Sequence, residues 1–247
     1  MLPEIGPIKT FGLMFGLAFV ASGLLVARRL REQGRPVDWA YEMVFAALLG
    51  GVVGARLWWF FENFGSAKDD VLGSLFGGSG LTWYGGALGG ALAVSVWARR
   101  RGLLGLGLLD LCAPALALGY AVGRVGGQLS GDGDYGEAWN GPWAMAYPEG
   151  VVPTDEKDHP TPVYETLAVG LAAWLLWRLR DRMAPGRLFA LYLVLAGAER
   201  LLVEFVRRNE PVALGLTTAQ WVSVAMLLAG AAWLGLSRRP RAAARPA

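Results

Sequence analysis

The sequence predicts an all-α integral membrane protein with about seven transmembrane helices, an N-terminus outside the cytoplasm and a cytoplasmic C-terminus. Three observations support this class: a high apolar content, several apolar stretches of membrane-spanning length, and positive charge that alternates between the connections. Of the 247 residues, 54% are hydrophobic and 17% are charged, and the mean hydropathy is +0.38. Such a chain is too apolar for an ordinary soluble domain.

The apolar stretches define the expected helices. A membrane-spanning helix needs roughly 20 mostly apolar residues, and seven stretches have about that length, so no large soluble domain remains. We therefore expect one polytopic membrane domain over residues 1–247. The first stretch is expected to be retained, because its basic cluster follows the apolar run instead of preceding it as in a signal peptide. The stretches are about 11–27, 38–60, 81–98, 108–127, 162–179, 187–206 and 217–237.

Positive charge determines the predicted orientation. Fifteen of the 23 Lys and Arg residues lie in four short segments, and the positive-inside rule places these segments in the cytoplasm. Residues 128–161 should then form an irregular extracytoplasmic cap between the fourth and fifth helices, and residues 238–247 a basic cytoplasmic tail. The net charge of +3 follows from this topology and from anionic membrane lipids, so no nucleic-acid partner is expected. The four basic segments are 28–35, 99–101, 178–187 and 238–245.

Single copies of cysteine and histidine exclude several kinds of chemistry. Cys112 and His159 cannot supply an intrachain disulfide, a CxxC redox pair or a metal site of the Cys/His type. We expect no cofactor. Cys112 lies among apolar residues and is interpreted as a packing residue. His159 could form a Ser-His-Asp arrangement with Asp155 or Asp158, but no nucleophile elbow accompanies it, so this alternative is disfavoured.

Residues 119–136 combine an apolar helix, a lone arginine, a run of glycines and an acidic loop. Arg124 and Gln128 lie one helical turn apart, beside glycines that recur every fourth residue and would form a stripe for close packing of a helix or a lipid. Asp132 and Asp134 alternate with glycines, which predicts a tight loop. These carboxylates could bind a divalent cation, although turn formation is the commoner role. The stripe consists of Gly119, Gly123, Gly127 and Gly131.

Charged residues within the predicted spans are candidates for a functional site, because charges inside a bilayer are costly and are usually paired or functional. Arg56, Arg124 and Arg200 lie in the outer halves of three different spans. Guanidinium binds phosphate bidentately, so we expect Arg124 and Arg200 to bind a lipid phosphate. Glu199 and Glu204 are interpreted more readily as partners in interhelical salt bridges.

Six short motifs occur in one order along the chain, and each is weak by itself. Their order on seven predicted spans resembles the prolipoprotein diacylglyceryl transferase family over nearly the whole length. The motifs are Ile5-Gly-Pro-Ile8, Gly54-Ala-Arg56, Tyr84-Gly85-Gly86, Gly123-Arg124-Val-Gly126, His159-Pro-Thr-Pro-Val-Tyr164-Glu165 and Arg200-Leu-Leu-Val-Glu204-Phe-Val-Arg207.

The resemblance implies a multi-pass enzyme of the bacterial cytoplasmic (inner) membrane. Such an enzyme transfers a diacylglyceryl group from phosphatidylglycerol to the lipobox cysteine thiol of a preprolipoprotein signal peptide, the first step of lipoprotein maturation. The products would be a thioether and glycerol 1-phosphate, and no metal is required. Arg124 and Arg200 would stabilise the phosphate. The implied substrate-binding residues, some of which hold the pocket in shape, are Arg56, Gly85, Gly86, Gln128, Ser130, Tyr164, Glu165, Glu204 and Arg207.

The chain departs from the family pattern at residues that would handle protons. Tyr84 replaces a usual histidine, and Gly127, Ser130 and Asp132 stand where the family signature continues with asparagines and a glutamate. Tyrosine has a pKa of roughly 10, so Tyr84 would serve as the base only if Arg124 lowered its pKa; Asp132 is the alternative base. Two rival functions stay open: a related lipid transferase with another acceptor, and an inactive phospholipid-binding membrane protein.

Overall fold

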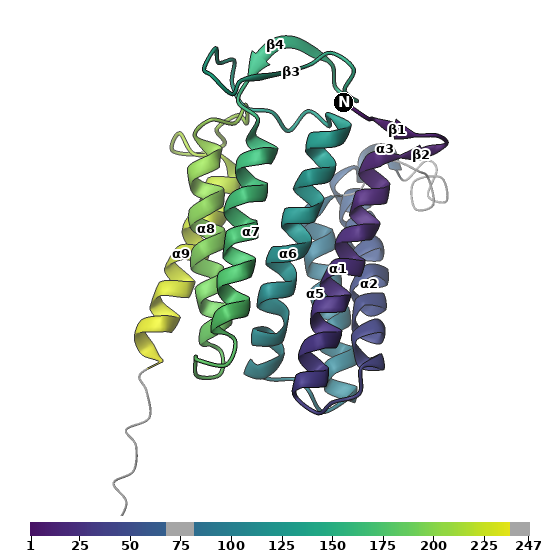
Figure 1. Cartoon of the computed structure of the whole chain (residues 1–247), viewed down its shortest axis with the longest axis vertical. Coiled ribbons are helices and arrows are strands. Elements are labelled where there is room, and N and C mark those ends of the chain that lie inside the picture. Colours follow the sequence, from purple (N-terminus) through teal and green to yellow (C-terminus); the bar gives the residue numbers. More distant parts are fainter. Residues whose placement is uncertain (68–81, 238–247) are drawn as a thin grey trace, which may run out of the picture. The chain divides into compact units, whose positions relative to one another are not determined.

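The computed structural model describes residues 1–67 and 82–237, and this part of the chain is mostly helical (Figure 1). Each of the seven predicted apolar stretches coincides with a long helix. A further short helix, α3, covers Phe64–Ala67. The predicted basic tail, residues 238–247, lies outside the described residues. The long helices are α1 (Thr10–Glu32), α2 (Asp38–Glu62), α5 (Trp83–Arg100), α6 (Leu106–Ser130), α7 (Thr161–Leu179), α8 (Arg187–Glu204) and α9 (Thr218–Leu236).

Four of these helices have the length and hydropathy to cross a membrane. They are α1, α2, α6 and α9, counted within the described residues. The other three are more polar: α5 is rich in glycine and ends in two arginines, α7 begins with prolines and polar residues, and α8 carries charges near both ends. The structure therefore supports a helical membrane protein. The prediction that all seven long helices span the membrane is supported by apolar content for four of them only.

The chain divides into two compact units, which are described separately. The first unit consists of Met1–Ser22 and Leu109–Ala247, and the second of Gly23–Leu108. Both divisions fall within helices, one in α1 and the other in α6.

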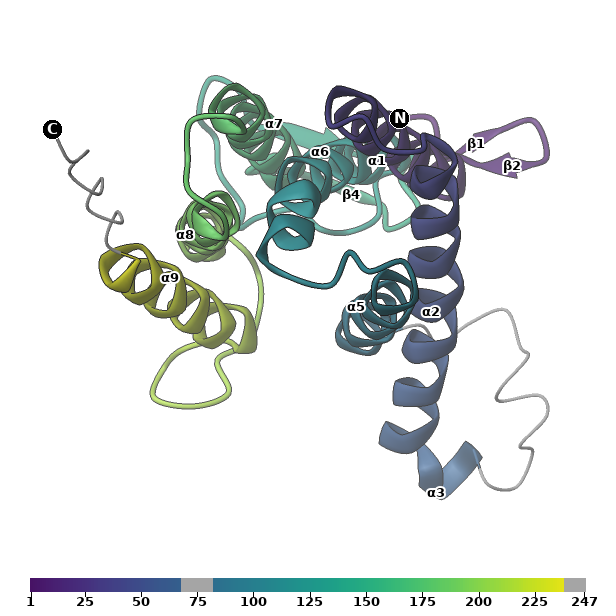
Figure 2. The same ribbon diagram turned by 90° about the horizontal axis from the view of Figure 1, so that it is seen from below.

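Small residues allow close helix packing in the first unit. The core between α6, α7 and α8 contains alanines at every fourth position of α6, which face larger aliphatic side chains of α7 and α8. Figure 2 shows α8 and α9 side by side, and Gly197 and Gly230 lie where these helices touch. A Cβ at Gly197 would be 2.9 Å from the Ser223 carbonyl oxygen. The core residues are Ala113, Ala117, Ala121, Val169, Ala173, Leu176 and Leu188.

The predicted glycine stripe of α6 is wrong as a continuous packing face. Gly119 and Gly126 contact α1, where an added Cβ would lie 2.6 Å and 2.7 Å from side-chain atoms. Gly123 has open space around its Cβ position, and Gly127 faces the side chain of the following acidic loop. Gly131 has a φ of +64° and ends the helix. The two glycines that contact α1, Gly119 and Gly126, are seven residues apart, because two turns of α6 return to the same face.

Two β-hairpins lie at the end of the first unit that carries the acidic loop. Strand β1 (Glu4–Ile5) pairs with β2 (Ile8–Lys9), and Gly6, with a φ of +61°, forms the turn. Strand β3 (Met145–Tyr147) pairs with β4 (Thr154–Asp158) beyond the adjacent ends of α6 and α7 (Figure 1). The prediction of an irregular cap over 128–161 is therefore wrong in two respects: the first three of these residues belong to α6, and the cap contains a hairpin.

Glycines bring α2 and α5 into backbone contact in the second unit. An added Cβ at Gly54 would collide with the Gly85 carbonyl oxygen, and one at Gly50 would lie 2.5 Å from the Gly89 carbonyl oxygen. At the opposite end of this pair, Glu42 accepts hydrogen bonds from Trp97 and Arg101. Packing therefore accounts for the glycines at this crossing.

Gly54→Ala is expected to destabilise the second unit, whereas Gly51→Ala is not. The Gly54 variant forces the helices apart, and overpacking of this kind costs about 1–3 kcal/mol. At Gly51 the new Cβ would lie 3.6 Å from the Gly86 carbonyl oxygen, an ordinary contact, and alanine favours the helix. Thermal unfolding of the detergent-solubilised variants tests the difference. Equal unfolding temperatures would contradict the proposed backbone contact.

Candidate functional site

Six ionised side chains of the first unit form one buried ion-pair cluster. They come from the last turns of α6, the acidic loop that follows it, the start of α7, the end of α8 and the residues just after α8. Three arginines face three carboxylates, so the cluster as a whole is balanced in charge. Its members are Arg124, Asp134, Glu165, Arg200, Glu204 and Arg207.

Glu165 is the centre of the cluster. One carboxylate oxygen lies 3.0 Å from Arg200 Nη1 and accepts a hydrogen bond of 2.8 Å from the Tyr120 hydroxyl. The other oxygen lies 3.2 Å from Arg124 Nε and 3.4 Å from Arg207 Nη1. The Glu165 side chain is 0% exposed. A carboxylate buried so completely is tolerated only because cations and donors surround it.

Glu204 connects the cluster to the start of α9. It lies 2.8 Å from Arg200 Nη2, one helical turn away on α8. The other oxygen accepts hydrogen bonds of 2.6 Å from the Thr217 hydroxyl and 2.7 Å from the Asn209 amide. Thr217 is also the N-cap of α9, where it forms a capping box with Gln220. The Thr217 side chain therefore both caps α9 and donates a hydrogen bond to the cluster.

Asp134 joins the acidic loop to the cluster through Arg124 and Arg207. Burial raises the pKa of Asp134, but the two guanidinium charges outweigh it, so the pKa is lowered overall. Asp132 does not pair with these arginines; its Oδ1 accepts the backbone N–H of Asp134 at 3.2 Å. Burial and the neighbouring Asp134 charge raise the pKa of Asp132. Turn formation is the role that the structure shows for Asp132, whereas Asp134 is an ion-pair partner.

The Asp134 pairs are expected to make stability depend on acid pH. Because the folded-state pKa lies below the ordinary value of 3.8, the stabilisation is present above that value and is lost as pH falls through the folded pKa. The unfolding temperature of the wild type should therefore fall more steeply below about pH 4 than that of Asp134→Asn. Thermal unfolding across this range measures the difference. Parallel curves for the two proteins would contradict the expectation.

Two of the arginines keep an accessible edge. The side chains of Arg124 and Arg200 are 18% and 23% exposed, against 7% for Arg207. Within the described residues, Nη2 of Arg124 has no hydrogen-bond partner. The predicted headgroup arginines therefore also form interhelical ion pairs. The interpretation as interhelical salt bridges is wrong for both glutamates: Glu204 pairs with Arg200 on its own helix, and Glu199 has no ion pair in the described part of the chain.

Other predicted substrate-binding residues fasten the cap to the helices. Gln128 accepts a hydrogen bond of 3.2 Å from the Tyr147 hydroxyl, and Tyr164 accepts one of 2.8 Å from Trp143. Ser130 is buried and donates to a backbone carbonyl of α6. These three residues lie in the first unit and contact the cap or the helix end; none of them pairs with a charged member of the cluster.

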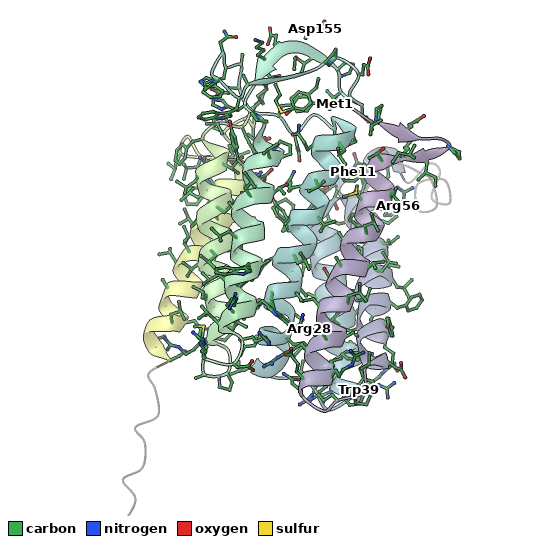
Figure 3. The ribbon with its side chains drawn as sticks, viewed as in Figure 1. Met1, Phe11, Arg28, Trp39, Arg56 and Asp155 are labelled. Atoms are coloured by element: carbon green, nitrogen blue, oxygen red, sulfur yellow. The ribbon has the colours of Figure 1, made fainter. Side chains whose placement is uncertain are left out.

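The remaining predicted residues belong to the second unit. Arg56 is buried on α2 (Figure 3), with its guanidinium carbon 5.6 Å from the centre of the Trp59 ring. Tyr84 is 37% exposed, and Gly85 and Gly86 face α2. A substrate-binding role for Arg56, Gly85 and Gly86, and a role for Tyr84 as the base, stay predictions.

Sequence reasoning missed two members of the site. Tyr120 donates to Glu165 and lies under the Arg124 guanidinium, 4.9 Å from its carbon; its position one turn before Arg124 is a signal that could have identified it. Thr217 donates to Glu204, and no short-range signal connects residues in different helices.

Apolar helices that surround a buried charged cluster define a helical membrane protein. The chain belongs to the prolipoprotein diacylglyceryl transferase family, whose sequence model matches residues 1–236. This confirms the predicted resemblance.

Relatives that match most of the chain carry the name phosphatidylglycerol–prolipoprotein diacylglyceryl transferase, among them the following three. The Chromohalobacter salexigens protein is 34% identical over 249 residues, which cover 95% of this chain and 91% of the relative. The Methylobacillus flagellatus protein is 33% identical over 244 residues, with 92% and 90% covered. The Clostridium tetani protein is 29% identical over 228 residues, with 90% of each chain covered.

Proposed function

We propose that this protein transfers the diacylglyceryl group of phosphatidylglycerol to the lipobox cysteine thiol of preprolipoproteins. Family membership over nearly the whole chain supports the reaction. The observation that carries the proposal is the buried ion-pair cluster, because it holds two partly exposed arginines, Arg124 and Arg200, on the central carboxylate Glu165. A phosphate ester is the group that such paired guanidinium edges recognise.

The cluster suits the charge changes of this reaction. The thiolate attacks the carbon of the diacylglyceryl group that carries the phosphate ester. A carbon–sulfur bond forms, and the bond between that carbon and the phosphate oxygen breaks. Glycerol 1-phosphate leaves with both electrons of that bond and carries more negative charge than the diester. Arg124 and Arg200 would stabilise this charge as it develops, and Glu165 would keep the guanidinium groups oriented before the substrate arrives.

We further propose that seven helices span the bacterial cytoplasmic membrane, with the N-terminus and the cap outside. Basic residues support this orientation, since α1, α5 and α7 each carry arginine in the last turn. Helices α2, α6 and α8, which would run in the opposite direction, carry none there. Arg124 and Glu204 lie in the outer ends of their helices under this topology, near the leaflet in which a lipobox peptide presents its cysteine after export.

A transfer assay tests the function. Purified protein in micelles that contain phosphatidylglycerol is incubated with a lipobox peptide, and we expect release of glycerol phosphate and a peptide heavier by one diacylglyceryl group. A peptide with serine in place of cysteine is the control. Retained lipid binding without release would favour the inactive lipid-binding alternative. Transfer to other thiols only would indicate a different acceptor.

A further inference from the structure

Among the described residues, Glu199 differs from the carboxylates of the cluster because no hydrogen bond or ion pair holds it. It lies on α8, next to Arg200, and its Oε1 atom is buried without a hydrogen bond among the described residues. Glu165 and Glu204, by contrast, are each held by arginines and hydroxyl groups. A buried carboxylate oxygen without a hydrogen bond is costly, so a function is the expected reason for its presence.

Glu199 lines a cavity of about 450 Å³ in the first unit. One wall is aromatic and fixed: the rings of Trp139 and His159 stack with centroids 4.4 Å apart, and Trp143 donates to the Tyr164 hydroxyl. The lining also includes aliphatic side chains of α8, among them Leu202 and Val203. A cavity with apolar walls and one unpaired carboxylate accepts an apolar segment that carries a single weakly acidic group.

We infer that this cavity binds the cysteine of the acceptor peptide and that Glu199 is the general base that removes the thiol proton. This inference rests on the proposed transferase function. The proton of the S–H bond passes to the Glu199 carboxylate, and the sulfur lone pair forms the bond to the glycerol carbon. The carbon–oxygen bond to phosphate breaks, and its electrons leave with glycerol phosphate. Glu199 then returns its proton to the released phosphate monoester or to water.

The other candidate bases are less suited to this step. Asp132 already accepts the backbone N–H of Asp134 in the turn. Tyr84 belongs to the second unit and is not among the residues that line this cavity. Glu165 is in contact with three arginines. Glu199 alone among these carboxylates combines an unpaired oxygen with a place in the cavity wall.

Several charged groups act on the ionisation of Glu199. Burial and the Glu165 charge oppose the ionised carboxylate, whereas arginines on α6, α8 and after α8 favour it. Helix α9, which packs along α8, carries no titratable side chain. The titratable and charged groups that face Glu199 are Tyr120, Arg124, His159, Tyr164, Glu165, Arg200 and Arg207.

The test compares the initial rate of transfer by Glu199→Gln and by the wild type as pH is raised. Near neutral pH we expect a loss of about 10²–10⁴-fold, the usual contribution of a general base. The loss should shrink at least tenfold above about pH 9, because a peptide thiol with a pKa of about 8.5 then ionises without a base. Phosphatidylglycerol binding should be unchanged. Glu137→Gln, an exposed cap variant, is the matched control and should keep the wild-type rate.

If Glu199 had only a structural role, the rates and stabilities of its variants would follow a different pattern. An unaltered rate at neutral pH, or a loss that stays constant as pH rises, would overturn the inference. Glu199→Gln should unfold at or above the wild-type temperature, since no ion pair is lost; a clear fall would show a hidden structural partner and would also overturn it. Glu199→Asp keeps a carboxylate and should retain part of the rate. Absence of transfer by the wild type would instead refute the proposed function itself.

Discussion

Replacing Glu165 by glutamine is expected to lower both the unfolding temperature and the rate of transfer sharply. The carboxylate is completely buried and lies within 3.4 Å of nitrogen atoms of Arg124, Arg200 and Arg207. Its neutralisation leaves three guanidinium groups opposite the two remaining carboxylates of the cluster. Removing one partner of a buried ion pair costs about 3–5 kcal/mol, because the remaining charge is uncompensated.

Thermal unfolding in detergent and the transfer assay measure these two effects. Glu137→Gln removes the same charge from an exposed position of the cap and should change neither quantity. Glu165→Asp keeps the charge but draws the carboxylate back by one methylene, so we expect an intermediate loss of stability. If Glu165→Gln unfolded and reacted like the wild type, the cluster would have no role in holding the helices or the arginines.

The helices were predictable from the sequence because apolar length is a local property. Each long helix coincides with one apolar stretch, and the prolines before α7 marked its start correctly, with Pro160 at the N-cap. The β3–β4 hairpin was not predictable in the same way. Strand β4 contains no apolar residue, and it is held by contacts with distant segments, such as the ion pair between Asp158 and Arg208. No periodicity within the cap reveals such a pairing.

The candidate site was predictable in its charges but not in its pairing. Charges within apolar stretches are conspicuous, so Arg124, Glu165 and Arg200 could be identified from the sequence. Asp134 was interpreted as a turn former or a cation ligand; one of its two partners, Arg207, lies 73 residues away in the sequence. Glu199 was interpreted as a salt-bridge partner because arginines lie near it in the sequence. In the structure, however, the adjacent Arg200 pairs with Glu165 and Glu204. Sequence proximity therefore does not determine which carboxylate a guanidinium group contacts.

Arg124→Lys is expected to abolish most transfer while it preserves more of the fold than Arg124→Ala does. Lysine keeps the positive charge beside Glu165 and Asp134 but lacks the planar fork that contacts both carboxylates and leaves Nη2 for a third ligand. Loss of one preorganised donor to a developing negative charge lowers kcat by about 10²–10³-fold. We therefore expect Arg124→Lys to lose kcat, and Arg124→Ala to lose both kcat and stability.

Arg207→Lys is the informative comparison, because Arg207 belongs to the same cluster but is only 7% exposed. Its guanidinium contacts Glu165 and Asp134 from the buried side, so this substitution should affect the unfolding temperature more than kcat. Arg31→Lys, at the exposed end of α1, controls for the loss of any guanidinium group. A rate for Arg124→Lys close to that of the wild type would show that the phosphate is bound elsewhere. Equal losses of kcat at positions 124 and 207 would show that the cluster acts through its structure, with no arginine in direct contact with the substrate.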